Sequence, residues 1–344
     1  MAGPRKFAWL RRIGWIVGAP LLACGAPPSG ESVGSTRQAI YAGTLDDQAD
    51  GVVSIKVGNA TQFELCSGSL LAPNVVLTAR HCVSKTISMT VSCNERGESG
   101  NGDHVGEDES LDVLHIYTGS KPLYGNAPAA EVHAIVHPAG GILCNADIAL
   151  LVLDRALTSV QPMRVRLGST PHSGERVRTV GYGQNDASLP VGTRMRKDAV
   201  KVLAIGQRVS ASQTPLASHE FELGLSICQG DSGGPAISED TGAVIGVVSR
   251  GGECGDDFGH IYTATNGFPD LFAKAFDLAG GAPLDEGVDP MAASGPGSTN
   301  ASASGPDSHG CSMSPPGGER DMYAWLATLF GCAGLLSRRR RLQR

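Results

Sequence analysis

The chain has 344 residues, of which 46 are glycine and only 5% are aromatic, a composition that favours many turns over long amphipathic helices. Its formal net charge of -6 argues against a nucleic-acid partner, because such a partner requires a basic face. No uninterrupted run of 18 or more apolar residues occurs, so the body of the chain contains no ordinary membrane span.

Residues 1–24 predict an export signal, because a basic region precedes an apolar run from Ile13 to Ala23. The run ends in Leu21-Leu22-Ala23-Cys24, which resembles a bacterial lipoprotein signal, where the cysteine receives the lipid. An ordinary cleaved signal with an incidental Cys24 is the alternative. In both cases we expect signal peptidase to process the chain and the body to be exported, where cysteines can be oxidised.

The body of the chain predicts an all-β fold. Residues 25–39 are small and polar and indicate a flexible linker or propeptide. From Ile40 onward, short β-branched runs alternate with turn residues, which favours a sandwich or barrel. One helix is expected at Pro269–Leu278, where a proline precedes apolar residues at helical spacing. The predicted strands are Val52–Val57, Leu70–Ala79 with a break at Pro73-Asn74, Ile87–Ser92, Glu131–Val136, Ile148–Leu153, Arg176–Gly181, Ala199–Ile205, Ala243–Ser249 and His260–Ala264.

The C-terminal part has a different composition. Residues 281–310 are rich in Gly, Ser, Pro and Ala and predict a disordered spacer. In residues 311–344, Cys311 is followed by a short apolar run from Met322 to Leu336 and by the basic cluster Arg338–Arg341. This order resembles the MYXO-CTERM sorting tail, which implies processing near Cys311 by sorting machinery and attachment at the cell surface. A plain membrane anchor is the alternative, and in either case the membrane is contacted through the anchor only.

The cysteines outside the signal and the tail form an even set. Nine cysteines occur in the chain, and Cys24, Cys311 and Cys332 lie in its terminal segments. No Cys-x-x-Cys pair is present, so we expect neither a zinc site nor another metal or cofactor. Six cysteines in an exported body suit three disulfides. They are Cys66, Cys82, Cys93, Cys144, Cys228 and Cys254.

The stretch from Cys228 to Pro235 places Ser232 among glycines, so that backbone can approach a substrate closely. A serine hydroxyl is a weak nucleophile until a base accepts its proton. Upstream, His81 follows an apolar run and Asp147 precedes Ile148-Ala149-Leu150. Each residue is commonplace alone, but the ordered set supplies a nucleophile, a base and an orienting acid.

Residues 40–280 resemble the trypsin-like serine proteases of the chymotrypsin fold. The resemblance implies an all-β protein of two six-stranded antiparallel Greek-key barrels, with the active site between them and a helix at the C-terminal end. It implies a serine endopeptidase acting on polypeptide substrates. The motifs that carry it are Thr78-Ala79-Arg80-His81-Cys82, Asp147-Ile148-Ala149-Leu150, Gly230-Asp231-Ser232-Gly233-Gly234-Pro235, Ile40-Tyr41-Ala42-Gly43, Cys66-Ser67-Gly68-Ser69-Leu70-Leu71, Ile135-Val136-His137-Pro138 and Gly181-Tyr182-Gly183.

The resemblance assigns a role to each catalytic candidate. Ser232 would attack the peptide carbonyl, His81 would transfer the proton, and Asp147 would orient the imidazole. The backbone N–H groups of Gly230 and Ser232 would form the oxyanion hole. Ser249 would lie near Asp147, and the segment Ser249-Arg250-Gly251 would pair with the substrate backbone as an added strand.

The resemblance also implies a zymogen. Cleavage before Ile40 would free an α-amine that inserts beside the carboxylate of Asp231 and sets the oxyanion loop. Ala39 precedes the cleavage site, so an activating protease of trypsin specificity is not expected to cut there. Family spacing implies the disulfides Cys66–Cys82 and Cys228–Cys254. The resemblance offers no counterpart for Cys93 and Cys144, which remain as a third pair by elimination.

The specificity pocket departs from trypsin itself. Ser226 stands at the position of the pocket base, where trypsins carry an aspartate, so a preference for Lys or Arg is not expected. A serine base suits apolar side chains. His260 and Arg250 near the cleft would instead favour acidic side chains. In the alternative alignment His260 points outward and Gly259 lines the pocket.

Two other functions remain to be compared. The Gly-x-Ser-x-Gly pattern around Ser232 also fits an α/β-hydrolase esterase, but that fold requires a helix after the serine and the order Ser, Asp, His. Pro235 and a predicted hairpin follow the serine here. A protease-like domain that only binds its partner is the second alternative, although such domains usually lose a residue of the triad or the oxyanion glycine.

Overall fold

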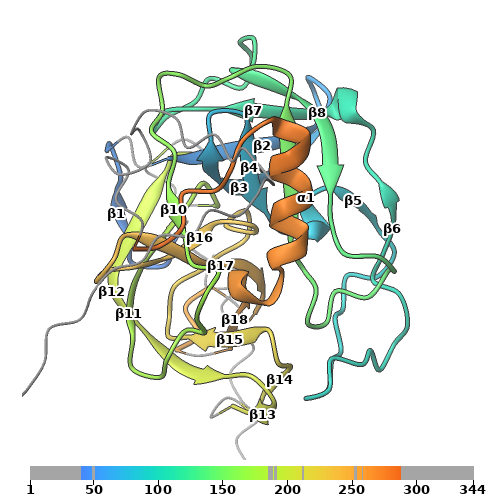
Figure 1. Cartoon of the computed structure of the whole chain (residues 1–344), viewed down its shortest axis with the longest axis vertical. Helices are drawn as coiled ribbons and strands as arrows, with labels where there is room; N and C mark the ends of the chain where they lie inside the picture. Colours follow the sequence, from blue (N-terminus) through green and yellow to red (C-terminus); the bar gives the residue numbers. More distant parts are fainter. Residues whose placement is uncertain are drawn as a thin grey trace, which may run out of the picture. The chain divides into compact units, whose positions relative to one another are not determined.

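The computed structural model describes residues 40–48, 51–184, 189, 192–210, 213–251, 254–257 and 259–287 (Figure 1). The predicted export signal, the linker, the sorting tail with Cys311 and most of the spacer lie outside the described residues. Within the described residues the chain forms 18 strands, three short 3-10 helices and the helix α1 (Pro269–Ala279). The expected all-β fold with one C-terminal helix is confirmed.

Six strands of the N-terminal half close into a barrel. In the order of their pairing they are β2 (Val52–Gly58), β3 (Phe63–Ala72), β4 (Val75–Thr78), β9 (Ala149–Leu153), β8 (Ala130–Val136) and β7 (Leu114–Tyr117). All of these pairs are antiparallel. The apolar side chains inside this barrel include Ile55, Leu70, Val76, Ile116 and Leu151.

Six strands of the C-terminal half close in the same order of connection. They are β11 (Arg176–Gly181), β12 (Met195–Ile205), β15 (Glu220–Leu223), β18 (His260–Ala264), β17 (Ala243–Arg250) and β16 (Pro235–Ser238). Pairing of β12 with β15 and of β11 with β16 completes the ring. Two short strands extend it: β1 (Thr44–Leu45) pairs with β12, and β10 (Arg164–Val165) runs parallel to β17.

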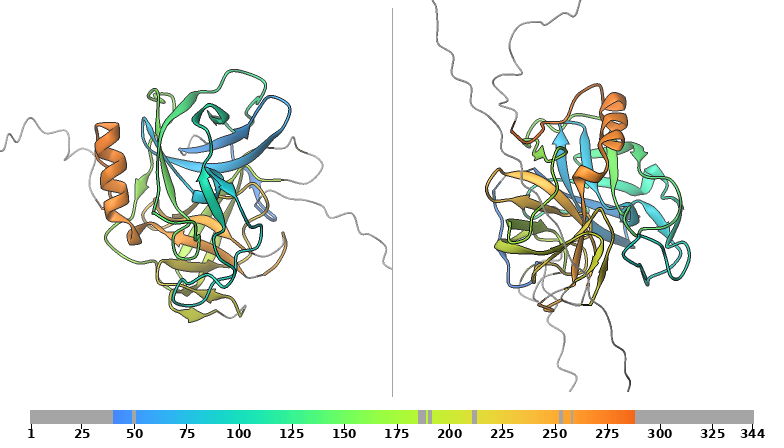
Figure 2. Two further views of the ribbon diagram at one scale, coloured as in Figure 1. Left: turned by 90° about the vertical axis from the view of Figure 1, so that its right-hand side faces the viewer. Right: turned by 60° about the horizontal axis from the view of Figure 1, so that its bottom comes forward.

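The two barrels share a core. A cluster that joins Leu77 and Leu150 of the first barrel to Val180 and Val247 of the second lies between them. The helix α1 contributes Phe272, Ala275 and Phe276 to this cluster and lies alongside β9 and β8 (Figures 1 and 2). It begins with Pro269 and ends before Gly280, which adopts a left-handed φ of 74°. The predicted helix is confirmed, with one more residue at its end.

The predicted strand Ile87–Ser92 is wrong. Two short strands, β5 (Ser84–Thr86) and β6 (Val105–Asp108), pair instead, and the residues from Ile87 onward form a loop. Ile87 is 63% exposed and Met89 is 92% exposed, so the apolar side chains have no core to enter. The N–H groups of Ile87 and Ser88 both donate to the carbonyl of His104, an arrangement that replaces a strand ladder.

Three disulfides are present, and their pairing is the expected one. Cys66–Cys82 joins β3 to the turn that follows β4, and Cys228–Cys254 joins the segments that precede β16 and β18. Cys93–Cys144 ties the long loop between β5 and β6 to the segment before β9. The remaining two-stranded element pairs β13 (Arg208–Val209) with β14 (Pro215–Leu216). None of the helices within the described residues is long and apolar enough to cross a membrane.

Candidate active site

His81 and Asp147 meet at the rim of the first barrel. His81 lies in the 3-10 turn Arg80–Cys82, directly after β4, and Asp147 directly precedes the segment that enters β9. His81 Nδ1 lies 2.8 Å from Asp147 Oδ2, and the backbone N–H of His81 donates to Oδ1 at 3.0 Å. Ser249 Oγ donates to Oδ2 at 2.7 Å. Asp147 is 1% exposed, so three hydrogen bonds fix a buried carboxylate.

The electrostatics of this pair favour a charged Asp147. Burial acts to raise the pKa of Asp147, but the charge of His81 and the hydrogen bonds from His81 and Ser249 hold it below its ordinary value. Burial acts to lower the pKa of His81, but the charge and hydrogen bond of Asp147 raise it above its ordinary value. Because the carboxylate can only accept, Nδ1 carries the proton in neutral His81 and Nε2 retains a free lone pair.

Ser232 lies in a tight loop that precedes β16 and packs against the first barrel. The backbone N–H of Ser67 donates to the carbonyl of Ser232 at 2.8 Å. Gly233 has a φ of +75°, and a Cβ there would lie 2.1 Å from Thr78 Oγ1, so only glycine permits this approach. Among the described residues no hydrogen bond joins Ser232 Oγ to His81 Nε2, and such bonds are often long before substrate arrives.

The loop presents two unused backbone donors beside Ser232. Gly230 has a φ of +92°, and a Cβ there would lie 2.8 Å from the Cα of Gly183. Its carbonyl accepts from Ser67 Oγ at 3.2 Å. Within the described part of the chain, the N–H groups of Gly230 and Ser232 have no hydrogen-bond acceptor. Two adjacent N–H groups without an acceptor can bind an oxyanion.

A buried carboxylate lies beneath the same loop. Asp231 and Ile40 are both 0% exposed, and the backbone N–H of Ile40 donates to Asp231 Oδ2 at 2.9 Å. The N–H groups of Cys228 and Gly183 donate to the same carboxylate at 2.8 and 2.9 Å. Burial raises the pKa of Asp231 to about 6. In the uncut chain the Ile40 nitrogen is a neutral peptide group, so it brings no charge to balance the carboxylate.

The trypsin family model matches residues 43–271. The chain belongs to the trypsin family. Phenoloxidase-activating factor 1 of Holotrichia diomphalia is 25% identical over 301 residues, which cover 75% of this chain and 78% of that protein. Protein masquerade of Drosophila melanogaster is 25% identical over 262 residues, 68% of this chain but 23% of that protein.

Two further comparisons are more partial. Serine protease SP24D of Anopheles gambiae is 32% identical over 190 residues, which cover 54% of this chain and 61% of that protein. The crystal structure of the scabies mite inactivated protease paralogue S-I1 gives a TM-score of 0.49 at 16% identity and covers 68% of this chain and 99% of that one. The family assignment therefore comes from the family model, and the barrel topology agrees with the fold expected for it.

The residues predicted to form the pocket of this trypsin-family chain are closed from water. Ser226 and His260 are each 0% exposed. His260 therefore does not point toward the solvent. His260 Nε2 lies 2.8 Å from the carbonyl oxygen of Asp256, to which it donates. Burial lowers the pKa of His260, so the ring is neutral at neutral pH.

Arg250 does not offer a free charge to a substrate. Its guanidinium donates to both carboxylate oxygens of Glu220, at 2.6 and 2.9 Å. The partner is a buried residue of β15 that also accepts from the backbone N–H of Asn145 at 2.7 Å. Glu220 belongs to none of the motifs found in the sequence. The alternation of glutamate with Phe221 and Leu223 was the available signal, because a carboxylate buried in a strand requires a partner.

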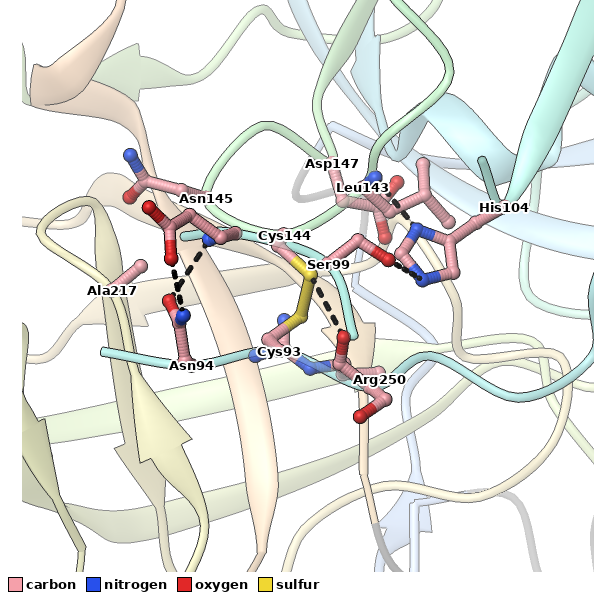
Figure 3. Close-up of a disulfide and its surroundings, with 12 residues drawn as sticks. Cys93, Asn94, Ser99, His104, Leu143, Cys144, Asn145, Asp147, Ala217 and Arg250 are labelled. Carbon is pink, nitrogen blue, oxygen red and sulfur yellow. Dashed lines mark hydrogen bonds between the residues drawn. A yellow bond between two sulfur atoms is a disulfide. The ribbon is translucent and has the colours of Figure 1, made fainter. Parts of the chain in front are cut away.

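The disulfide Cys93–Cys144 lies beside Asp147 and Arg250 (Figure 3). Three contacts tie its loop to the segment that leads to Asp147. Cys144 is bonded to Cys93, and the N–H of Leu143 donates to His104 Nδ1 at 3.1 Å. A Cβ on Gly97 would lie 2.8 Å from the Cβ of Asn145, which shows how closely the loop packs there.

The described residues contain one cluster with metal-ligand geometry, and its chemistry is unsuitable. The ligand atoms of Cys66, His81 and Cys82 lie within 4.8 Å of one another. The two sulfur atoms are bonded to each other in a disulfide. A metal site would need them as thiolates, so these residues do not fit a metal ion.

Proposed function

We propose that the chain is an exported serine endopeptidase that hydrolyses peptide bonds through an acyl-enzyme on Ser232 and becomes active when the chain is cut before Ile40. One observation supports this most strongly. The hydrogen-bonded pair of His81 and buried Asp147 lies on one barrel rim, and the glycine loop of Ser232, with its two unused N–H groups, packs against that rim.

In the proposed first step, Ser232 Oγ attacks the carbonyl carbon of the substrate and gives its proton to His81 Nε2. Asp147 stabilises the imidazolium through the 2.8 Å contact with Nδ1. The oxyanion accepts hydrogen bonds from the N–H groups of Gly230 and Ser232, each worth about 3–4 kcal/mol of barrier. His81 then protonates the leaving amine as the carbon–nitrogen bond breaks, and the acyl-enzyme remains.

In the second half of the reaction a water molecule gives a proton to His81 Nε2 and attacks the ester carbon. Collapse of the tetrahedral intermediate breaks the bond to Ser232 Oγ, which takes the proton back from His81. During both halves the substrate backbone would pair with the segment Ser249-Arg250-Gly251, as a strand added to β17. Gly251 is exposed, which suits this pairing.

Activation is proposed to act through the charge of Asp231. Cleavage before Ile40 would replace its peptide N–H, 2.9 Å from Asp231 Oδ2, with an ammonium group. The ammonium would lower the raised pKa of Asp231 and fix the loop that bears Gly230 and Ser232. An activating protease is a required partner. Cleavage there would also detach a lipid carried on Cys24 and leave the tail at Cys311 as the anchor.

The three disulfides fit an oxidising compartment outside the cytoplasm. Attachment to the cell envelope, through either terminal segment, is part of the proposal. Fractionation of cells that express the full chain tests it: the protein is expected with the envelope or on the surface. A Cys311→Ser chain cut before Ile40 is expected to leave this fraction, and its retention there would argue for another anchor.

The enzymatic proposal is tested with the full chain cut before Ile40 at an inserted recognition sequence. We expect it to cleave a mixed peptide library, and Ser232→Ala to remove this activity by about 10⁴-fold or more. Ser173→Ala, on the exposed surface, is the matched control and should leave the rate unchanged. Absence of cleavage by the folded, cut chain would support the alternative, a protease-like domain that binds its partner.

A further inference from the structure

The base of the pocket beside the Ser232 loop is filled by protein. Ser226, His260 and Tyr262 are each 0% exposed, so no water molecule fits against any of them. Ser226 lies two residues before Cys228, and Tyr262 packs with Ile227 in the core of the second barrel. A pocket that admitted a long side chain would leave its floor accessible to solvent when empty. Here the floor is closed.

The alternation of side chains along β18 determines which residue closes the floor of the pocket. His260 and Tyr262 point to one face of the strand, and Ile261 points to the other. Tyr262 stacks on Phe221 with ring centroids 5.5 Å apart and lies in one cluster with Ile227. Ile261 packs elsewhere, with Ala204 and Leu216. The ring of His260 is therefore on the side of the segment that contains Ser226.

The ring of His260 is fixed in this position. Its Nε2 donates to the carbonyl of Asp256 at 2.8 Å. The pocket is narrow at this level, because a Cβ on Gly251 would lie 3.0 Å from the Cα of His260 and 2.7 Å from the carbonyl oxygen of Gly259. The backbones at the ends of β17 and β18 are thus in close contact.

We propose that His260 fills the lower part of the specificity pocket, so that this enzyme cleaves after small residues such as alanine or serine. The proposal rests on the proposed endopeptidase function and adds the substrate class. A phenylalanine, leucine or arginine side chain would have to displace the ring and break the bond to Asp256. Inserting atoms into a filled site is destabilising, and even one methylene in a pocket changes rates by about 10–200-fold.

The structure also argues against the acidic preference considered from the sequence. That preference needs a free positive charge at the pocket. Arg250 is neutralised by Glu220, with two hydrogen bonds of 2.6 and 2.9 Å. Lys197, a basic residue whose charge acts on His260, is held by its hydrogen bond to the carbonyl of Leu225 at 2.8 Å. His260 itself is buried and donates to a carbonyl.

The test uses the full chain cut before Ile40 and quenched peptides that differ only in the residue before the scissile bond. Alanine, serine, leucine, phenylalanine, glutamate and arginine are compared at that position. We expect kcat/KM for alanine and serine to exceed the others by at least about tenfold. His260→Gly should open the pocket and raise kcat/KM for phenylalanine by at least about tenfold, with a smaller gain for His260→Ala.

The matched control is His133→Gly, a histidine on an exposed position of β8, which should keep the wild-type ranking. Equal or faster cleavage after phenylalanine, leucine, glutamate or arginine by the wild type would overturn the proposal. So would a wild-type ranking in a His260→Gly chain that reacts normally with a serine-directed phosphonate. If the His260→Gly chain does not react with the phosphonate, the ranking is measured with His260→Ala instead. An unchanged ranking in that variant overturns the proposal, and a gain for phenylalanine supports it. If the wild type neither reacts nor cleaves any peptide, the endopeptidase function fails, and this inference fails with it.

Discussion

The two barrels have the same order of strand connections but contribute different halves of the site. In the first barrel the third strand is β4, and the segment after it bears His81. In the second barrel the third strand is β15, and the segment after it bears Ser232. The segment between the fifth and sixth strands leads to Asp147 in the first barrel and to His260 in the second. One barrel thus supplies the candidate base and acid, and the other supplies the candidate nucleophile and the pocket.

The two halves differ in what fixes them. The His81 half is held by contacts already present in the uncut chain, which are the Cys66–Cys82 disulfide and the hydrogen bonds to Asp147. The Ser232 half contacts Ile40, a residue that precedes both barrels, through the hydrogen bond from Ile40 to buried Asp231. The comparison suggests that the base is preset and that the nucleophile loop is the part under control.

The largest effect should come from removing the base. His81→Ala is expected to lower kcat by about 10⁴–10⁶-fold, because Ser232 Oγ then has no proton acceptor. The double change His81→Ala with Ser232→Ala should cost little more, since residues that act as a unit are not additive. Active-site kinetics on the cut chain measure this. If the fall in kcat of the double variant equalled the product of the falls in the two single variants, the two barrels would not act together.

The disulfides should stabilise the first barrel unequally. Replacing Cys93 and Cys144 by serine opens a link across 51 residues of sequence. The chain-entropy model gives about 4 kcal/mol for a loop of that size and about 3 kcal/mol for the shorter Cys66–Cys82 loop. Urea unfolding of the two double variants compares them. A smaller loss from the Cys93–Cys144 pair would mean that its loop contributes little order to the Asp147 segment.

The second barrel should gain stability from cleavage before Ile40, and more so at higher pH. In the uncut chain Asp231 has a pKa of about 6, above its value in the unfolded chain. The free energy of unfolding therefore falls by about 3 kcal/mol as the pH rises from the unfolded pKa to about 6 and Asp231 becomes ionised. The new ammonium offsets this cost. The difference in free energy of unfolding between cut and uncut chains should therefore be larger at about pH 7.5 than at about pH 4.5, where Asp231 of the uncut chain is protonated and has no charge to be balanced. A difference independent of pH would remove Asp231 from the account.

Ser249 links the barrels and should have the smallest effect. Ser249→Ala removes the 2.7 Å hydrogen bond to Asp147 from β17 of the second barrel. We expect roughly a tenfold fall in kcat/KM, the value of one hydrogen bond to a charged group.

The acid limb of the pH profile should lie above about pH 6.5 in the wild type, because the pKa of His81 is raised and only the neutral ring accepts a proton. Asp147→Asn should move this limb to lower pH.

Local motifs allowed much of this arrangement to be predicted from the sequence. The runs around His81, Asp147 and Ser232, the disulfide partners of Cys66 and Cys228, and the helix at Pro269 depend on short spacings or on a family pattern. The strand predicted at Ile87–Ser92 failed because a β-branched run alone cannot show whether a core lies beside it. Ile87 and Met89 have none.

The pocket could not be predicted because long-range pairing decides it. Arg250 reads as a free cation until β15 brings Glu220 to within 2.6 Å. His260 could point inward or outward until the register that pairs Arg250 with Ile261 sets which face of β18 it occupies. A one-residue shift of that register would reverse every side chain of the strand. Because every residue of β18 is buried, the polarity pattern of its sequence does not show which of its two faces His260 occupies.

The central claim is that an intact triad is controlled by the Ile40 nitrogen. It is tested most directly by the stoichiometry of a serine-directed phosphonate on the full chain, before and after cleavage at Ile40, with the modified residue located by peptide mapping. The account predicts about one equivalent on Ser232 after cleavage, with much slower reaction before it. Equal labelling of the uncut chain, or no labelling of Ser232 in the cut chain, would contradict it.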